Sequence, residues 1–286
     1  MPQDEPVRHH RLLPRALLAS CLALLTATAA LAAEAGFPWP GGARAAVSLA
    51  YDDALDSQLD HAIPALDRAG LKGSFYLTLG SGAVARRLPE WRAAAARGHE
   101  LGNHTLFHQC AGSLPGREWV PPEADLDKTS VAQIVAQVRL GNTMLQAIDG
   151  RTERTFTAPC GDTRAAGEDY IHLVAPEFLA IKLGPGGVVA DMARLDLHAV
   201  PVDVPVGATG EQLIARVKEA ARTGTMVNFT FHGIGGDHLS VSSEAHQALL
   251  RFLADHRGTY WTAPFVEIAR HVKETRQRQG GPSHRQ

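Results

Sequence analysis

The segment AAVSLAYDD occupies residues 45–53. Its first seven residues form a short β-rich apolar run, and two carboxylates follow at once. Side chains alternate between the faces of a strand, so Asp52 and Asp53 can serve one site only where the strand ends. Barrel enzymes place their chemistry at that edge of the sheet. The stretch therefore predicts a strand that carries two carboxylates to a functional edge, although the pair alone also fits a helix cap or a turn.

Similar apolar runs alternate with segments of helical periodicity along the chain. This order predicts an α/β protein with βα units and a parallel sheet. Six or seven units in one domain fit a closed or nearly closed (β/α) barrel better than an open sheet, and no G-x-G-x-x-G turn follows the first strand. We expect strands at residues 45–51, 73–79, 100–103, 155–158, 179–183, 197–204 and 225–231. We expect helices at residues 57–69, 89–97, 130–148, 211–222, 243–256 and 264–273.

Both ends of the chain are expected to lie outside the folded domain of residues 34–273. Three arginines precede an uncharged apolar run that ends in small residues at Ala33. This pattern is typical of a secretory signal peptide, which we place at residues 1–33. Secretion or export to the periplasm follows, with no transmembrane segment after processing; an uncleaved anchor or a lipoprotein site at Cys21 is the alternative. Residues 274–286 are polar, lack periodicity and are expected to be disordered.

Composition narrows the classes of function. The 286 residues carry a formal net charge of −2, and no basic stripe is visible. This balance argues against a nucleic-acid-binding protein. The chain after the signal peptide is long enough to bury one large core, so we predict a single domain. The oligomeric state is left open.

Two histidines four residues apart, His104 and His108, are candidate metal ligands. On a helical turn both imidazoles would face the same way and could bind one ion, although the spacing alone also fits an ordinary helix start. Together with Asp53 they form an open ligand set of two histidines and one carboxylate. Such a set suits zinc and other divalent metals, and it leaves Asp52 free to act as a base.

Two further segments are candidates for chemistry. Residues 228–233, NFTFHG, carry His232 to a glycine loop, where a histidine can protonate a leaving group or be an ordinary core residue. We expect the nearby His238 only to line this loop. Residues 157–162, TAPCGD, form at least a turn, in which Pro159 and Gly161 could aim the N–H of Cys160 at a developing oxyanion.

Two cysteines follow the signal peptide, Cys110 and Cys160, and each lies near a candidate site segment. In an oxidising compartment they can form a disulfide that ties two site loops together. The alternative is a pair of small buried thiols. A cysteine-based zinc cluster is not expected, because no second C-x-x-C partner is present.

These segments, in this order, resemble the polysaccharide deacetylases of the NodB-homology type, carbohydrate esterase family 4, from about Ala45 to about Trp261. The resemblance implies a distorted (β/α)7-type barrel that removes acetyl groups from acetylated polysaccharides or oligosaccharides such as chitin, peptidoglycan or xylan. It implies a divalent metal, most often Zn2+ and sometimes Co2+ or Ni2+. The roles that it implies are the catalytic base for Asp52, the general acid for His232, and metal ligands for Asp53, His104 and His108.

Two family motifs are altered. The family commonly has Arg-x-Pro followed by an aromatic residue, whereas this chain has Thr157-Ala158-Pro159-Cys160, so the arginine that would hold the base carboxylate is missing. We expect Arg154 or Arg164 to replace it. The Asp-rich motif that tunes the acid histidine is not visible either, and we take Asp203 as its counterpart.

The altered motifs leave alternatives open. They slightly favour an acetylxylan-esterase-like O-deacetylase over an N-deacetylase, because an ester demands less of His232. A non-catalytic, metal-containing glycan-binding protein is a second class, although it would not need Asp52 or His232. Trp119 could stack on a sugar ring or pack on its own loop. No serine in a G-x-S-x-G elbow offers an alternative nucleophile.

Overall fold

A ring of parallel strands forms the centre of the protein. The computed structural model describes residues 36–280. Each strand of the ring is parallel to its neighbours. In ring order the strands are β1 (Ala45–Asp52), β2 (Ser74–Leu77), β3 (Glu100–Asn103), β4 (Thr155–Thr157), β7 (Ala180–Pro185), β8 (Val200–Val202) and β9 (Met226–Phe231).

The ring closes between β8 and β9 at Asp203, which forms a bridge with Phe229. The N–H of Asp203 donates to the carbonyl of Asn228 at 2.9 Å, and the Asp203 carbonyl accepts from Thr230 N–H at 2.7 Å. An eighth strand, β10 (Tyr260–Thr262), pairs with the first half of β1. The nearly closed seven-stranded barrel that the sequence predicted is therefore confirmed; the three-residue strand β10 was not predicted.

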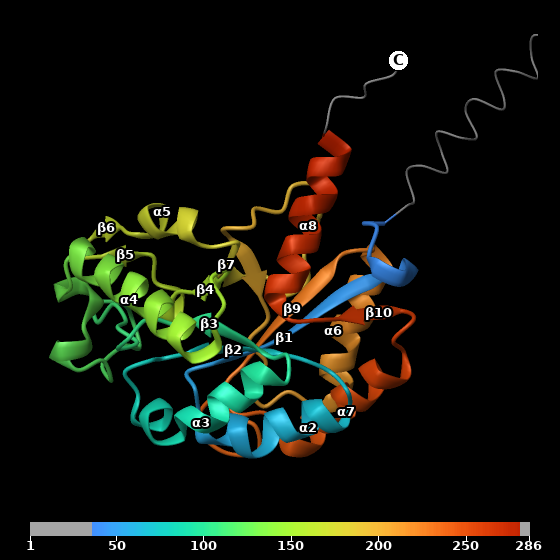
Figure 1. The fold of residues 1–286 in the computed structure, drawn as a ribbon, viewed down its shortest axis with the longest axis horizontal. Helices are drawn as coiled ribbons and strands as arrows, with labels where there is room; N and C mark the ends of the chain where they lie inside the picture. Colours follow the sequence, from blue (N-terminus) through green and yellow to red (C-terminus); the bar gives the residue numbers. More distant parts are fainter. Residues whose placement is uncertain (1–35, 281–286) are drawn as a thin grey trace, which may run out of the picture. The chain divides into compact units, whose positions relative to one another are not determined.

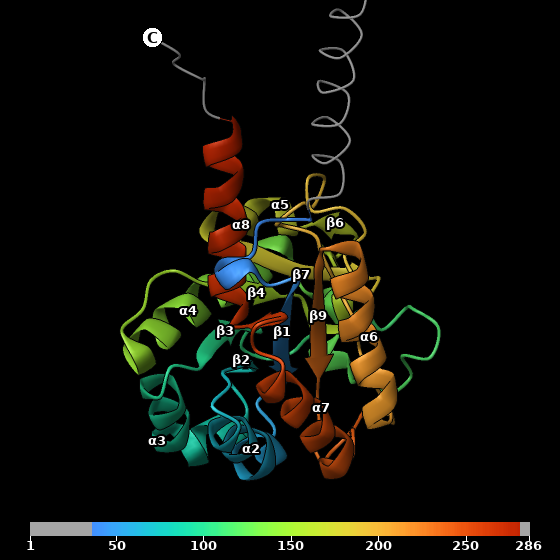
Figure 2. The same ribbon diagram turned by 90° about the vertical axis from the view of Figure 1, so that its right-hand side faces the viewer.

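Helices surround the sheet (Figures 1 and 2). Helices α2 (Ile63–Arg68), α3 (Gly82–Ala96) and α7 (Ser243–Asp255) lie together along one side, with α8 (Phe265–Gly280) opposite. The remaining α-helices are α4 (Val131–Asp149), α5 (Ile171–Val174) and α6 (Gly210–Thr223). Short elements are the hairpin β5 (Arg164–Ala165) and β6 (Glu168–Asp169), the π-turn η2 (Gln58–Ala62), and the 3-10 turns η1 (Pro40–Gly42), η3 (Pro122–Ala124), η4 (Leu126–Lys128), η5 (Pro159–Gly161) and η6 (Ala175–Glu177).

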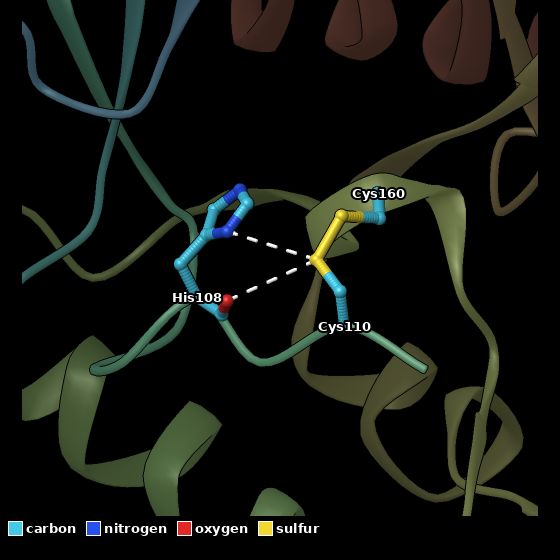
Figure 3. Close-up of side chains that lie close together, drawn as sticks. All are labelled: His108, Cys110 and Cys160. Carbon is cyan, nitrogen blue, oxygen red and sulfur yellow. Dashed lines mark hydrogen bonds between the residues drawn. A yellow bond between two sulfur atoms is a disulfide. The ribbon is translucent and has the colours of Figure 1, made fainter. Parts of the chain in front are cut away.

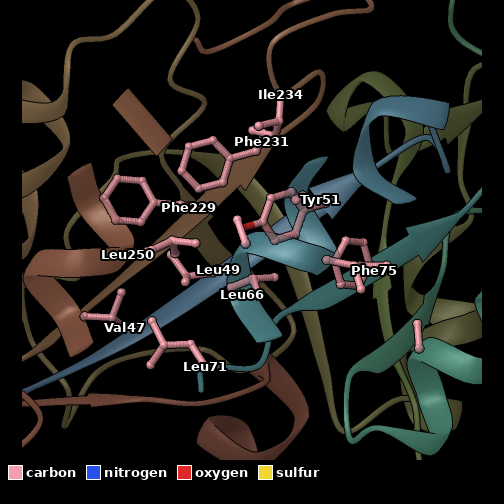
Figure 4. Packing of buried hydrophobic residues seen from close by; sticks show 14 of the residues in the cluster. Val47, Leu49, Tyr51, Leu66, Leu71, Phe75, Phe229, Phe231, Ile234 and Leu250 are labelled. Carbon is pink, nitrogen blue, oxygen red and sulfur yellow. The ribbon is translucent and has the colours of Figure 1, made fainter. Parts of the chain in front are cut away.

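The two faces of β1 carry side chains of different size. Its large residues face the helices and share one core cluster with β2 and β9; Figure 4 shows Val47, Leu49 and Tyr51 in it. The intervening residues are small, and Ala46 and Ala50 belong to a second cluster. Asp52 continues this second row, because side chains two apart share a face. The strand therefore ends with the Asp52 carboxylate pointing into the barrel.

Two helix boundaries differ from the sequence prediction. Helix α3 begins at Gly82 and not at Pro89, because Ser81 caps it and the chain bends at Arg87 (φ −115°, ψ 21°). Pro89 thus stands in the first turn after the bend, where its missing N–H costs little.

Helix α8 continues to Gly280, so the expected disorder of residues 274–280 is wrong. There Thr275 is buried, and the Arg276 guanidinium donates to the Leu195 carbonyl at 2.7 Å. The predicted signal peptide and residues 281–286 lie outside the described residues. Within residues 36–280, none of the helices has the length and apolar character needed to cross a bilayer.

Candidate active site

The candidate residues meet at the mouth of the barrel, beyond the carboxyl ends of the strands. A cleft of about 1040 Å³ opens there. Its lining includes the expected catalytic, metal-binding and oxyanion residues, namely Asp52, Asp53, His104, His108, Cys160 and His232. Side chains far apart in the sequence thus share one cavity because parallel strands end at one edge.

The chain turns sharply after β1, and this turn brings two consecutive carboxylates into the cleft. Asp53 has a φ of 81° and Ala54 a φ of 58°, both in the left-handed region. A non-glycine residue in that region costs about 1–3 kcal/mol, and such strain concentrates at functional sites. The turn redirects Asp53, which in a continued strand would point to the opposite face from Asp52.

His104 and His108 both reach the same oxygen of Asp53. The Nε2 atom of each ring lies 3.1 Å from Asp53 Oδ1. We expected the two histidines on a helical turn, and this expectation is wrong. A loop holds them, in which Thr105 (φ 62°) and His108 (φ 50°) have left-handed backbone conformations. Side chains replace the helical hydrogen bonds, since Asn103 Oδ1 accepts from Thr105 N–H and Thr105 Oγ1 accepts from His108 N–H.

This trio fits a divalent cation. The Thr157 carbonyl lies 2.8 Å from His104 Nδ1, so that nitrogen donates its proton there, and in the neutral ring the Nε2 lone pair faces Asp53. A lone pair facing a carboxylate needs a cation or a proton between them. Two ligands at about 2.0–2.1 Å from one tetrahedral zinc lie about 3.3 Å apart, close to the observed 3.1 Å. All three ligand atoms lie within 4.8 Å of one another.

Asp53 is the electrostatic centre of the site. Burial alone raises its pKa, but hydrogen bonds with His104, His108 and His238 outweigh burial and hold the pKa far below its ordinary range. His238 Nε2 lies 2.7 Å from Asp53 Oδ2, so the expectation that His238 only lines its loop is wrong. Burial lowers the pKa of His104, whereas its bond to Asp53 raises that pKa, and the net result is a raised value.

A buried lysine holds the second carboxylate. Lys182 Nζ lies 2.7 Å from Asp52 Oδ1, and the lysine side chain is 0% exposed. The same ammonium donates to Thr230 Oγ1 at 3.1 Å and lies 4.0 Å from the centroid of the Tyr76 ring. Burial lowers the pKa of Lys182, and Asp52 opposes this effect only in part. Lysine is almost never fully buried unless it is paired, so the contact with Asp52 accounts for its position.

Lys182 lies directly beside Thr157, the position at which the family has its arginine. Strands β4 and β7 are neighbours, and Thr157 and Lys182 are direct partners in their ladder. Thr157 stands where the family has arginine, and its Oγ1 lies 3.5 Å from Asp52 Oδ2. The positive charge beside Asp52 therefore comes from Lys182 on β7 and not from an arginine on β4.

Neither arginine that we expected as a replacement contacts Asp52. Arg154 binds both oxygens of Asp149 at 2.6 and 2.7 Å, and Arg164 donates to the carbonyl of Gly167. The sequence did contain a signal for the correct residue, since Lys182 is the single charged side chain in the apolar run of residues 179–183. A charge inside a buried strand needs a partner in the protein interior.

Asp203 does not contact the acid histidine, so its assignment as the tuning carboxylate is wrong. Val202 and Val204 line the cleft, and alternation turns the intervening Asp203 to the outer face. There its Oδ2 pairs with Arg216 Nε at 3.1 Å. His232 Nδ1 is buried without a hydrogen-bond partner among the described residues, and Nε2 lies 3.9 Å from Asp53 Oδ2. Burial lowers the pKa of His232, with Asp52 and Asp53 opposing it.

A disulfide joins the loops that follow β3 and β4. Cys110 and Cys160 are bonded, with their Cα atoms 5.9 Å apart. Figure 3 shows the bond beside His108, whose Nδ1 lies 3.8 Å from Cys110 Sγ. Oxidised sulfurs are not thiolates, so these cysteines do not compete with Asp53 for a metal. Cys160 itself is left-handed (φ 59°) and lines the cleft, as an oxyanion donor in this turn must.

Comparison with known families agrees with this geometry. Residues 41–172 match the family described as polysaccharide deacetylase. Over these residues the chain is similar to polysaccharide deacetylases. The resemblance to the NodB-homology type, carbohydrate esterase family 4, is thereby confirmed. The matched residues supply Asp52, Asp53, the two histidines and both cysteines of the site, whereas Lys182 and His232 lie beyond them.

Solved structures share the fold of this chain. The Xyl-CE4 domain of a multidomain xylanase from the hindgut metagenome of Trinervitermes trinervoides is 17% identical, with a TM-score of 0.50, over 82% of this chain and 90% of that one. A peptidoglycan N-acetylglucosamine deacetylase catalytic domain from Eubacterium rectale is 16% identical, with a TM-score of 0.50, over 82% and 94%.

A carbohydrate esterase family 4 pseudoenzyme from Bacillus anthracis is 17% identical, with a TM-score of 0.50, over 78% of this chain and 65% of that one. At such identities these three similarities show the shared fold alone. Comparison with curated proteins finds no match.

Proposed function

We propose that the protein is a secreted, metal-dependent hydrolase that removes acetyl groups from a glycan. The observation that carries the proposal is the division of labour between two adjacent carboxylates. Asp53 faces His104 and His108, whereas Asp52 is held apart from them by Lys182. A site that only bound metal would not need the second carboxylate or its buried lysine.

The residues of the chain take distinct roles in the proposed reaction. Asp53, His104 and His108 would hold the cation. Their nitrogen and oxygen donors suit Zn2+ first, with Co2+ or Ni2+ as alternatives. The bound cation supplies Lewis acidity toward the acyl carbonyl and toward water. Asp52 accepts the proton of the attacking water, and Lys182 fixes the direction of its free oxygen. The N–H of Cys160 faces the developing oxyanion.

His232 donates a proton to the leaving group in this proposal. Among the described residues its Nδ1 has no carboxylate partner to stabilise the charged form, and burial lowers its pKa, so its supply of protons at neutral pH is small. An ester demands less of this acid than an amide does. The structure of the acid thus supports O-linked acetyl groups, as on acetylated xylan, over N-linked ones.

A panel of acetylated substrates tests the proposal. Acetate release is measured from acetylated xylan, chitin oligomers and peptidoglycan with added Zn2+, for wild type and Asp52→Asn. We expect release by wild type and a loss of about 10²–10⁴-fold in the variant, with metal content unchanged. Asp56→Asn is the matched control, because Asp56 is half-buried and pairs with Arg86 and Arg87 outside the cleft.

The same panel discriminates the second class of function. If wild type releases no acetate from any substrate while it retains metal and glycan affinity, the protein is a glycan-binding module and the hydrolase proposal fails. Export is tested separately, since N-terminal sequencing of the mature protein should begin near residue 34.

A further inference from the structure

A chain of buried hydrogen bonds leads from deep in the barrel to the pair formed by Asp52 and Lys182. It begins at Glu100 on β3, whose side chain is buried. Thr155 Oγ1 donates to Glu100 Oε1 at 2.5 Å. The Tyr76 hydroxyl lies 2.7 Å from the same threonine oxygen. It is the donor there, because the single hydroxyl proton of Thr155 is already committed to the carboxylate. The chain therefore ends at the ring of Tyr76.

The neighbouring strands fix where this ring lies. Tyr76 on β2 is the ladder partner of Asp52 on one side and of Gly102 on the other. A Cβ atom on Gly102 would lie 2.4 Å from two carbons of the Tyr76 ring, so the ring packs directly on the bare backbone of β3. A tyrosine hydroxyl that is hydrogen-bonded and a ring that rests on backbone leave the side chain little freedom. Tyr76 is therefore a rigid part of the barrel interior.

The ring completes the surroundings of the Lys182 ammonium. An ammonium has three N–H donors. Two are used by Asp52 Oδ1 at 2.7 Å and Thr230 Oγ1 at 3.1 Å, and within residues 36–280 no third oxygen or nitrogen accepts from it. The centroid of the Tyr76 ring lies 4.0 Å from Nζ, well inside the range of a cation–π contact. Because the lysine is buried, this contact is stronger than it would be in water.

We infer that Tyr76 is a positioning residue of the reaction proposed above. Its ring holds the Lys182 ammonium on Asp52, and the chain through Thr155 to Glu100 holds the ring. The inference rests on the proposed hydrolase function and assigns to it a residue outside all the site motifs. Tyr76 is fully buried and does not line the cleft, so it acts through the lysine and not on the substrate.

Two substitutions of Tyr76 test the inference by kinetics. Initial rates are measured with zinc-loaded protein on p-nitrophenyl acetate. Tyr76→Phe keeps the ring but loses its anchor, and kcat should fall about 2–10-fold. Tyr76→Leu loses the ring as well, and kcat should fall about 10–30-fold. KM should stay within about twofold in both, because the substrate does not reach this residue. An unchanged kcat in both variants, or a loss confined to KM, overturns the inference.

Tyr260→Leu is the matched control for the loss of a buried ring. Tyr260 is 7% exposed, belongs to β10 and does not line the cleft. This variant should unfold at lower urea concentration than wild type but keep its kcat. If it lowers kcat as much as Tyr76→Leu does, the loss reflects a weakened fold and the inference fails.

Two further comparisons trace the path of the effect. In a Lys182→Met background, Tyr76→Leu should lower kcat no further, because the ammonium that the ring holds is gone. An equal fall in both backgrounds means that Tyr76 acts independently of the lysine and overturns the inference.

The second comparison tests the anchor and does not depend on the lysine variant. Thr155→Ser keeps the hydroxyl that links Tyr76 to Glu100 and should keep kcat. Thr155→Val keeps the shape but loses the hydroxyl, and it should lower kcat about as far as Tyr76→Phe does. Equal kcat in the two threonine variants contradicts the role of the chain.

Urea unfolding separates failure of the inference from failure of the proposed function. Wild type, Tyr76→Leu, Lys182→Met and the double variant form a cycle, in which the cost of the lost ring volume cancels. We expect the two substitutions to be coupled by about tenfold or more in the unfolding equilibrium constant. Coupling without any ester hydrolysis by wild type shows that the ring holds the ammonium and refutes the hydrolase proposal. Hydrolysis of acetylated glycans, with no coupling and with kcat unchanged in both Tyr76 variants, refutes the inference and leaves the proposed function standing.

Discussion

The Lys182 ammonium lies 2.7 Å from Asp52 Oδ1 and on the strand beside the one that lacks the family's arginine. A lysine is a point charge on a flexible stem, whereas an arginine grips a carboxylate with a rigid fork. The packing around Lys182 replaces that rigidity, because Thr230 and the Tyr76 ring fix the ammonium on two further sides. The carboxylate therefore keeps a defined direction although the arginine is absent.

Removing this charge should damage catalysis and stability together. Lys182→Met leaves Asp52 buried without its cation, which costs about 3–5 kcal/mol of unfolding free energy, and kcat/KM should fall about 10²-fold or more. Urea unfolding and initial rates provide the two measurements. Lys128→Met, at a lysine with a 64% exposed side chain, should change neither.

The double variant Lys182→Met with Asp52→Asn separates the two effects. Neutral partners should recover much of the lost stability, because no buried charge is left alone, but they should not recover activity. Recovery of activity along with stability would show that Asp52 is not the base and that the pair acts on the fold alone.

The sequence predicted the barrel well because its β-rich runs alternate with helical segments along the chain. The run at residues 45–51 and the NFTF run of residues 228–231 both became strands of the ring. The equally short β4 and β8 were expected from the β-rich runs around them, whereas no such run was recognised around β10. The bend at Arg87 was missed because one irregular φ leaves no periodic trace.

The site was harder to predict where partners come from different strands. Asp53, His104 and His108 could be grouped because each belongs to a recognisable motif. Lys182 could not, because its role depends on the register between β4 and β7. The predicted role of Asp203 was wrong for a related reason. A shift of one position along the chain after β8 decides whether a side chain faces the cleft or α6.

The metal ligands can be tested without any activity assay. His104→Ala removes a nitrogen whose ring is oriented by the Thr157 carbonyl. Since loss of such orienting partners alone weakens metal binding by about 10–100-fold, loss of the ligand should weaken it at least as much. Metal content after dialysis against Zn2+ is measured by elemental analysis.

His238→Ala provides the contrast, because His238 contacts the other oxygen of Asp53 and is 56% exposed. We expect this variant to retain its metal. If His238→Ala loses metal as completely as His104→Ala, the ligand set has four members and the three-residue assignment is wrong.

The disulfide should stabilise the loops that carry His108 and Cys160. It closes a loop with a sequence separation of 50, and chain entropy predicts about 4 kcal/mol for a loop of that length. Cys110→Ser with Cys160→Ser should therefore lower the free energy of unfolding by about 2–4 kcal/mol. Thiol titration of the unfolded, unreduced chain from residue 34 onward should find no free sulfhydryl, and two free thiols would refute the crosslink.

Acid should destabilise the metal-free protein through His246, which is buried against the Tyr51 hydroxyl at 2.7 Å. Burial lowers the pKa of His246 from 6.5 to about 3, so between these values the unfolded state binds a proton that the folded state excludes. Unfolding free energy should thus fall by about 1.4 kcal/mol per pH unit as the pH drops below 6.5. In urea titrations with EDTA at pH 7, 6 and 5, His246→Gln should lose this part of the slope, whereas His172→Gln, at a 65% exposed side chain, should keep it. Identical slopes in all three proteins would mean that His246 is protonated in the folded state.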